Sequence, residues 1–167
     1  MSMRKYLRDF AKMNASVQAH AHSERQKAAR EYLSQLTRKN ARIQALMEQQ
    51  QHYRETAERI TRGYSKAPSA SSHRAGSVIE ECVAGIDEVE REIKQRIEEY
   101  TELTREIEAA IARIPDDRYR DILRWRYVNG WKWERIAKEM NYSDMKWLWN
   151  LHRRALEALE VPPLKHD

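Results

Sequence analysis

The sequence has few residues that break helices and few that fill a thick core. Its 167 residues include four glycines, four prolines, one cysteine and one phenylalanine. So few helix breakers exclude a β protein, which needs many turns. No stretch approaches the roughly 18 to 20 consecutive apolar residues of a membrane span, and the first 27 residues lack a hydrophobic signal core. We therefore expect an all-α protein that has no membrane partner.

The single cysteine, Cys82, cannot form a disulfide within the chain, which is typical of a reducing compartment. We therefore expect a cytoplasmic protein. Charged residues make up 34% of the chain, and the net charge is +5. The charge is uneven: residues 1–76 carry +9, residues 77–115 carry −6 and residues 116–167 carry +2. A basic segment followed by an acidic one predicts two helices that pair their charged rims, and the net charge favours a polyanionic partner.

A seven-residue repeat runs from residue 77 to residue 114. Isoleucine or tyrosine recurs at every seventh residue from Ile79 to Ile114, and smaller apolar residues fill the intervening positions, with Arg96 the exception. Such a seam, sustained over about five heptads, predicts a long helix that packs on another helix. Val83, Ile97 and Ile111 widen the stripe, which favours more than one neighbour. The expected oligomerisation residues are Ile79, Ile86, Val89, Ile93, Tyr100, Leu103 and Ile107.

A second, weaker heptad pattern covers residues 26–62, and the Gly-, Pro- and Ser-rich residues 63–76 read as a linker. We therefore expect residues 26–114 to form a long antiparallel helical, coiled-coil hairpin that also oligomerises. A parallel self-dimer of either helix is the alternative, because the heptads alone do not fix orientation. Residues 1–25 form a basic N-terminal arm, either disordered or helical on binding.

Residues 115–161 have the signals of three short helices, and residues 162–167 form a tail. Pro115 ends the long helix, and Asp116 or Asp117 can cap a helix that stops at Gly130. A second helix follows over residues 131–140. Asn141 tolerates a left-handed turn, and Ser143 or Asp144 can cap a final helix that reaches about residue 160.

The last two short helices have the pattern of a helix-turn-helix, in which the second helix reads DNA. On the second helix Leu148, Leu151, Ala155 and Leu159 are expected to face inward. The opposite face carries side chains that can reach base edges or phosphates. The candidate base contacts are Met145, Lys146, Trp149, Asn150 and Arg153. The candidate phosphate contacts are Arg118, Arg120, Arg124, Lys132, Arg135, Ser143 and Arg154.

A family resemblance is carried by DILRWRYVNGWKWERIAKEMNYS, at residues 121–143, and by LHRRAL, at residues 151–156. These stretches resemble the sigma-region-four-like module of phage regulators of the RinA and ArpU kind. The long acidic helix that leads into them is also similar. Three departures from that pattern are Lys132 in place of a Ser/Thr cap, Asn141 in place of a glycine, and one extra residue before His152.

The resemblance implies a phage or prophage regulator in the bacterial cytoplasm. Such a protein would bind double-stranded promoter DNA and activate late or packaging genes as a homo-oligomer, a dimer or larger, with host RNA polymerase as a further partner. Two other readings stay open. Small terminase subunits, which package DNA, also join a helix-turn-helix to helical oligomerisation segments. Alternatively, a face of tryptophans binds polymerase and DNA is not bound.

Four of the five tryptophans lie between residues 131 and 149, too many for the interior of so small a module. We expect Trp133 to be buried, and Trp149 is the candidate for exposure. The extra residue leaves open whether Trp147 or Leu148 is buried at the start of the last helix.

No motif for a catalytic site, a cofactor or a metal is present. His20 and His22 have no accompanying cysteine or carboxylate cluster, so a metal site is not expected. The sequence therefore predicts a protein that is not an enzyme.

Overall fold

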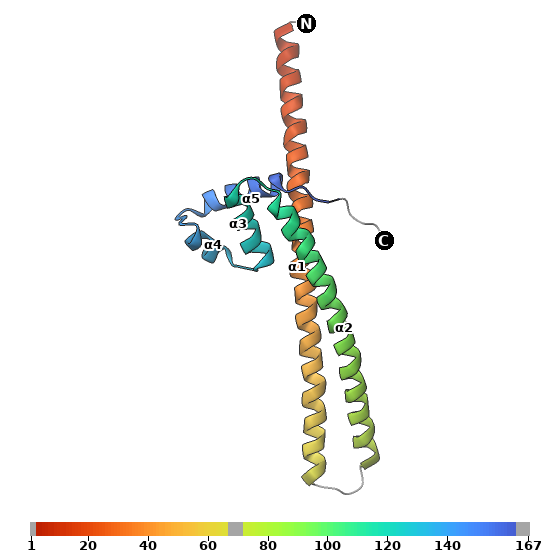
Figure 1. Cartoon of the computed structure of the whole chain (residues 1–167). Helices are drawn as coiled ribbons and strands as arrows, with labels where there is room; N and C mark the ends of the chain where they lie inside the picture. Colours follow the sequence, from red (N-terminus) through yellow and green to blue (C-terminus); the bar gives the residue numbers. More distant parts are fainter. Residues whose placement is uncertain (1–2, 67–71, 163–167) are drawn as a thin grey trace. The chain divides into compact units, whose positions relative to one another are not determined.

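The computed structural model describes residues 3–66 and 72–162, and the side chains of residue 15 and of residues 17–63 and 75–162. These residues form helices and no strands, as expected from the composition (Figure 1). Two long helices come first, and short ones follow. Their bounds are α1 Met3–Lys66, α2 Ser72–Ala112, α3 Asp117–Leu123, η1 Arg124–Val128, α4 Trp133–Glu139 and α5 Met145–Ala158. No helix among the described residues is apolar enough over a sufficient length to cross a membrane.

The helix boundaries agree with those predicted from the sequence, except around the predicted arm and linker. Helix α1 begins at Met3, so it includes most of the segment expected as an N-terminal arm. The two long helices also extend into the predicted linker from both sides, up to Lys66 and from Ser72. Residues 67–71 of the linker and residues 163–167 of the tail lie outside the described part of the chain.

The chain divides into two compact units, and both long helices contribute to both of them. One unit holds residues 38–103, which are the end of α1 and most of α2. The other holds residues 1–37 and 104–167, which are the start of α1, the end of α2 and all the short helices.

In the unit of residues 38–103, the two long helices lie side by side (Figure 1). Lys39 Nζ lies 2.8 Å from Glu99 Oε2, and Arg42 Nη2 lies 3.1 Å from Glu92 Oε1. The expected pairing of a basic rim with an acidic one is therefore present at these two positions. Because these side chains are exposed enough for solvent to screen their charges, each pair contributes little to stability. Apolar packing is the main stabilising term.

Apolar residues of the heptads fill the seam between these helices. Ile43 and Leu46 of α1 are buried, as are Cys82, Val89 and Leu103 of α2. Gly85 lies so close to Tyr53 that a Cβ at residue 85 would lie 2.9 Å from the phenol ring. A larger residue at position 85 would therefore require the Tyr53 ring to shift. The other predicted oligomerisation residues of this unit are half-buried: Ile79, Ile86, Ile93 and Tyr100.

In the other unit, one apolar core joins the short helices to the ends of the long ones. It has Leu33 and Leu36 from α1 and Ile107 and Ile111 from α2, all at most 1% exposed. The short helices add Ile122, Leu123, Ile136, Leu148, Ala155 and Leu156, none of which is exposed to solvent. Burying each large side chain contributes about 1.5 to 3 kcal/mol. The short helices are therefore held by long-range packing, since each is too short to be stable alone.

Candidate nucleic-acid interface

Helix α3 and the π-helical turn η1 begin the C-terminal region. Asp116 caps α3, because its carboxylate accepts a hydrogen bond from Arg118 N at 2.9 Å. The Arg118 guanidinium, hydrogen-bonded to the same carboxylate, lowers its pKa. In η1 the helix widens to a π-turn, in which Asn129 N donates to Arg124 O at 2.9 Å. Gly130 then ends the helix in the left-handed region, with φ of 66°. Only the π-turn was not expected from the sequence.

A tight turn over residues 140–144 joins α4 to α5. Asn141 adopts φ of 55°, and Tyr142 N donates to Ala137 O at 2.9 Å, which closes the end of α4. This confirms the left-handed turn predicted at Asn141. At its other end α4 starts at Lys132, which makes no side-chain cap, as expected from its departure from Ser/Thr.

Helix α5 starts at Asp144, whose carboxylate accepts a hydrogen bond from Lys146 N at 2.8 Å. Its inward stripe consists of Leu148, His152, Ala155, Leu156 and Leu159, all of them buried. Leu151, which we expected in this stripe, is only half-buried. Position 152 takes its place because the helical repeat brings the residue four after Leu148 back to the same face.

The alternative left open at the start of α5 is resolved in favour of Leu148. Leu148 is fully buried, whereas Trp147 is 66% exposed and is the most exposed of the large apolar side chains described. The expected burial of Trp133 is only partly right, because its ring is half-buried. Three polar or aromatic side chains surround that ring instead of a closed apolar core.

His152 is the one buried polar residue in the described core, at 5% exposure. Its Nε2 lies 3.1 Å from Tyr127 Oη, and its ring lies edge-on to Trp133 at 4.8 Å. Burial lowers the pKa of His152 to about 4, and the nearby Arg30 and Arg126 act in the same direction. The imidazole is therefore neutral at physiological pH. It joins α5 to η1 and α4, and it offers no positive charge to a phosphate.

Four of the five tryptophans form two groups, each with an arginine. Trp125 and Trp131 stack at 5.3 Å between centroids, and the Arg135 guanidinium lies 3.7 Å above the Trp131 ring. In the second group Trp133 contacts Trp149 at 4.6 Å and Arg126 at 4.9 Å. Stacking on an aromatic ring orients a guanidinium while its N–H groups at the edge can still donate. Arg135 is exposed and is held in this way.

Among the candidate base contacts, Lys146, Asn150 and Arg153 lie away from the buried stripe of α5, whereas Met145, three residues before Leu148, lies on the side of that stripe. Lys146, Trp149 and Arg153 are exposed, and Met145 and Asn150 are half-buried. Trp149 is 47% exposed even though its ring packs on Trp133. Around the helix, the face opposite the buried stripe carries Lys146, Asn150, Arg153, Arg154 and the carboxylate of Glu157, and Trp147 and Trp149 flank it.

The candidate phosphate contacts fall into two groups. Four of them are exposed: Lys132, Arg135, Ser143 and Arg154. The other three pair with carboxylates, Arg118 with Asp116, Arg120 with Asp117 and Arg124 with Glu108. Arg120 also donates to the carbonyl of Ile114 at 2.6 Å. Arg120 therefore attaches α3 to the segment that follows α2, and Arg124 attaches η1 to α2. The sequence does not reveal these structural roles.

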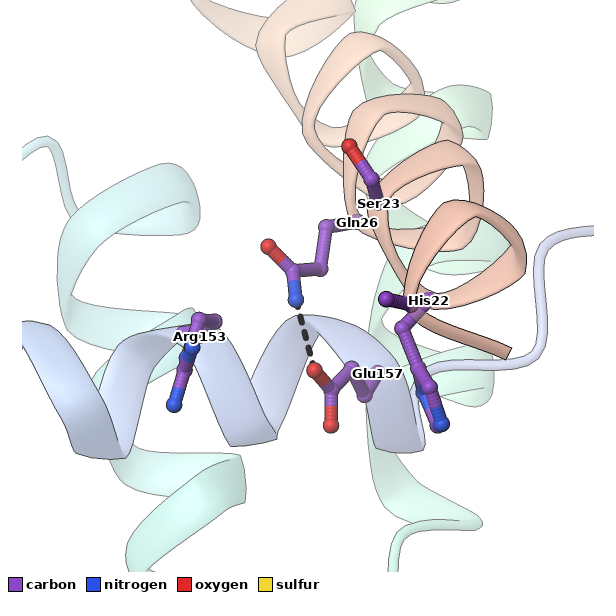
Figure 2. Close-up of a pocket in the computed structure, with 6 residues that line it drawn as sticks. His22, Ser23, Gln26, Arg153 and Glu157 are labelled. Carbon is purple, nitrogen blue, oxygen red and sulfur yellow. Dashed lines mark hydrogen bonds between the residues drawn. The ribbon is translucent and has the colours of Figure 1, made fainter. Parts of the chain in front are cut away.

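A groove of about 390 Å³ lies between α1 and the second half of α5 (Figure 2). Ala19, His22, Ser23 and Gln26 of α1 line it together with Arg153 and Glu157 of α5. Gln26 Nε2 donates to Glu157 Oε1 at 2.6 Å, so the start of α1 and the end of α5 are directly hydrogen-bonded. No seven-residue pattern predicts this contact, because it joins residues far apart in the sequence.

No three His, Cys, Asp or Glu side chains in the described part of the chain are grouped so that they could hold a metal ion. What the geometry provides is an exposed helix face with cations, an amide and two tryptophans. Such a face can bind the surface of another molecule. It contains no nucleophile with an adjacent base.

Fold and site thus define a helical protein with a long helix pair and a short C-terminal group of helices. The chain belongs to the family described as protein of unknown function (DUF1492), which matches residues 68–160. That match runs from the start of α2 to the end of α5. Searches of curated proteins and of solved structures gave no match.

Proposed function

We propose that the chain is a DNA-binding transcriptional regulator whose helices α4 and α5 form a helix-turn-helix. The observation that carries this proposal is the asymmetry of α5. One side packs Leu148 and His152 into the core, and the other presents Lys146, Asn150 and Arg153 to solvent. A helix held from behind with polar, cationic side chains in front is the arrangement that enters the major groove.

In this proposal the front of α5 reads base edges. Lys146 and Arg153 donate to guanine, and Asn150 can make a paired contact with adenine. The exposed Lys132, Arg135, Ser143 and Arg154 contact the flanking phosphates, which fix position without reading sequence. The stack of Arg135 on Trp131 holds that guanidinium ready for such a contact.

The groove between α1 and α5 extends the proposed interface. Ser23 and His22 line it beside Arg153, and these two side chains of α1 can donate to a backbone phosphate. Helix α1 is basic in its first half. Its first two dozen residues therefore act as an arm that follows the DNA backbone.

The two long helices form an antiparallel coiled-coil hairpin in this proposal. The pairs Lys39–Glu99 and Arg42–Glu92 support it, because a higher number on α1 goes with a lower number on α2. One helix-turn-helix makes a small interface, so useful affinity requires two copies on spaced half-sites. The hairpin brings in the second copy by associating with the hairpin of another chain, which makes the protein a homo-oligomer.

The resemblance to phage regulators of the RinA and ArpU kind gives the biological setting. On that basis the chain acts in the cytoplasm of a bacterial host, binds promoter DNA and activates late or packaging genes with host RNA polymerase. A packaging protein of the small-terminase type would instead form a ring of about eight or more subunits that binds DNA with weak sequence preference.

Trp147 favours a second candidate function, the binding of a protein. This residue is 66% exposed. Burying a surface tryptophan against a partner contributes more to binding than burying most other side chains. RNA polymerase is the partner in this case. The two functions are compatible if α5 reads DNA with its front and Trp147 contacts polymerase from the flank.

A mobility-shift titration of the full chain against fragments of its own genomic neighbourhood, at low and physiological salt, tests the proposal. We expect one fragment to stay bound at physiological salt. Equal binding of all fragments that disappears with salt would show that only net charge acts.

A promoter–reporter assay then compares wild type with Trp147→Ala. Unchanged DNA binding with lost activation would assign Trp147 to the polymerase contact.

A further inference from the structure

Three apolar side chains remain exposed on the unit of residues 38–103. Met47 of α1 is 49% exposed, and Val83 and Ile97 of α2 are 50% and 47% exposed. They are not scattered. Val83 and Ile97 are two heptads apart, and Glu90 occupies the same position in the heptad between them. Two of the three apolar residues directly follow a buried residue of the seam, since Met47 follows Leu46 and Val83 follows Cys82.

The ion pair between the two helices places all three on one flank of the helix pair. Arg42 and Glu92 pair across one flank. Met47 is five residues after Arg42, and Ile97 is five after Glu92, which is a rotation of about 140° around each helix. Both therefore lie on the opposite flank. Along the pair, Arg42 lies level with Glu92 and Tyr53 with Gly85, so Met47 lies at a level between those of Val83 and Ile97.

We call this flank the open face and define it by Met47, Arg54, Val83, Glu90 and Ile97. Arg54 is one heptad after Met47, and both Arg54 and Glu90 are exposed. The same heptad position in the other unit is occupied by Leu33 on α1 and Ile111 on α2, and both are fully buried. Apolar residues at this position are thus covered where the chain provides a partner, and uncovered over residues 38–103.

We infer that a second copy of this chain covers the open face. The face is self-complementary, since it carries one cation on α1, one anion on α2 and an apolar residue next to each. A two-fold axis perpendicular to the helices, between the levels of Met47 and Arg54, packs α1 on the α1 of the second copy. It brings Met47 to the level of Val83 of the second copy and Arg54 to the level of its Glu90, each pair lying across a diagonal of the bundle. Each contact is then made twice, as in an isologous dimer. Two hairpins packed in this way form a four-helix bundle.

This inference rests on the hairpin of the proposed function and specifies how the two copies associate. An unrelated partner would need no such balance of charge on one face. A symmetric copy needs each surface to carry both halves of every pair, and the open face meets that requirement.

Sedimentation equilibrium of the full chain without DNA tests the inference. We expect wild type to have twice the chain's mass of 20.0 kDa. Arg54→Glu places like charges opposite each other and should raise the dimer dissociation constant at least about tenfold. Arg54→Glu/Glu90→Arg should restore the wild-type dimer. The control is Arg91→Glu, which makes the same charge change at an exposed residue outside the open face.

Met47→Glu/Val83→Glu adds charges to the apolar part and should give a monomer whose far-ultraviolet circular dichroism is unchanged. A monomeric wild type at tens of micromolar would overturn the inference. So would a dimer that all open-face variants leave intact, or a swap that does not rescue. Because no DNA is present, a dimer that binds no operator would instead contradict only the proposed function.

Discussion

Two residues in the left-handed region end helices of the C-terminal region, Gly130 after η1 and Asn141 after α4. Glycine adopts that conformation without strain, and asparagine is among the few other residues that tolerate it. Asn141 stands where the resembled family has a glycine, so the departure in sequence preserves the backbone conformation. Both turns could be predicted from sequence because the requirement is local.

Asn141→Val should lower the free energy of unfolding by about 1 to 2 kcal/mol, because a β-branched residue is strained at φ of 55°. Asn141→Gly should stay within about 0.5 kcal/mol of wild type. Urea unfolding measures both. Equal stability of the valine and glycine variants would refute a left-handed turn at this residue.

His152 should make the stability of the chain depend on pH. Burial lowers its folded-state pKa to about 4, below the ordinary value of 6.5, so the unfolded chain binds more protons in between. Stability is therefore complete above pH 6.5 and falls as the pH drops toward 4. The expected loss between pH 7.5 and pH 5 is about 2 kcal/mol.

Urea unfolding at several pH values compares wild type with His152→Gln. The slope over this interval is the readout, because the substitution also changes absolute stability. The variant should show a much flatter slope. Identical slopes would mean that His152 is not held neutral in the folded chain.

At the scale of elements, the sequence predicts helices far better than their contacts. The heptads from Ile79 to Ile114 give α2, and Pro115, Asp116 and Asp144 mark helix ends, because periodicity and capping are local properties. The π-turn η1 and the hydrogen bond between Gln26 and Glu157 were not predictable. Both depend on packing between segments distant in sequence.

The orientation of α5 was also beyond the sequence. Trp147 and Leu148 are adjacent, and either could have been the buried residue at the start of the helix. Packing against the core of Ile122, Leu123 and Ile136 decides which of the two is buried, and Leu148 is the buried one. For this reason, Trp147 could not be selected from the sequence as a candidate functional residue.

Leu148→Ala should destabilise the chain by about 2 to 5 kcal/mol, because it leaves a cavity in a closed core. Trp147→Ala, one residue earlier, should change stability by less than about 0.5 kcal/mol because its ring is mostly in solvent. Thermal unfolding followed by circular dichroism gives both values. A larger effect at Trp147 would mean that α5 is turned the other way.

For the whole molecule, different parts of the sequence have different roles in the proposals. The heptads of α2 pack on the chain's own α1 through Val89 and Leu103, and the widened stripe through Val83 and Ile97 is proposed to pack on a second copy. The tryptophans and cations near the C-terminus are proposed to bind DNA. The sequence could indicate that the stripe is too wide for one neighbour. It could not indicate which residues the chain itself covers.

The measurement that tests the central claim most directly is the salt dependence of binding to the preferred DNA fragment. It compares wild type, Lys146→Ala/Arg153→Ala and the matched control Arg91→Ala/Lys94→Ala, which removes two exposed cations from α2. We predict that the first pair weakens binding at least about tenfold and makes the log–log salt slope shallower by up to about two, while the control stays near wild type. Equal losses for both pairs would contradict DNA recognition by α5.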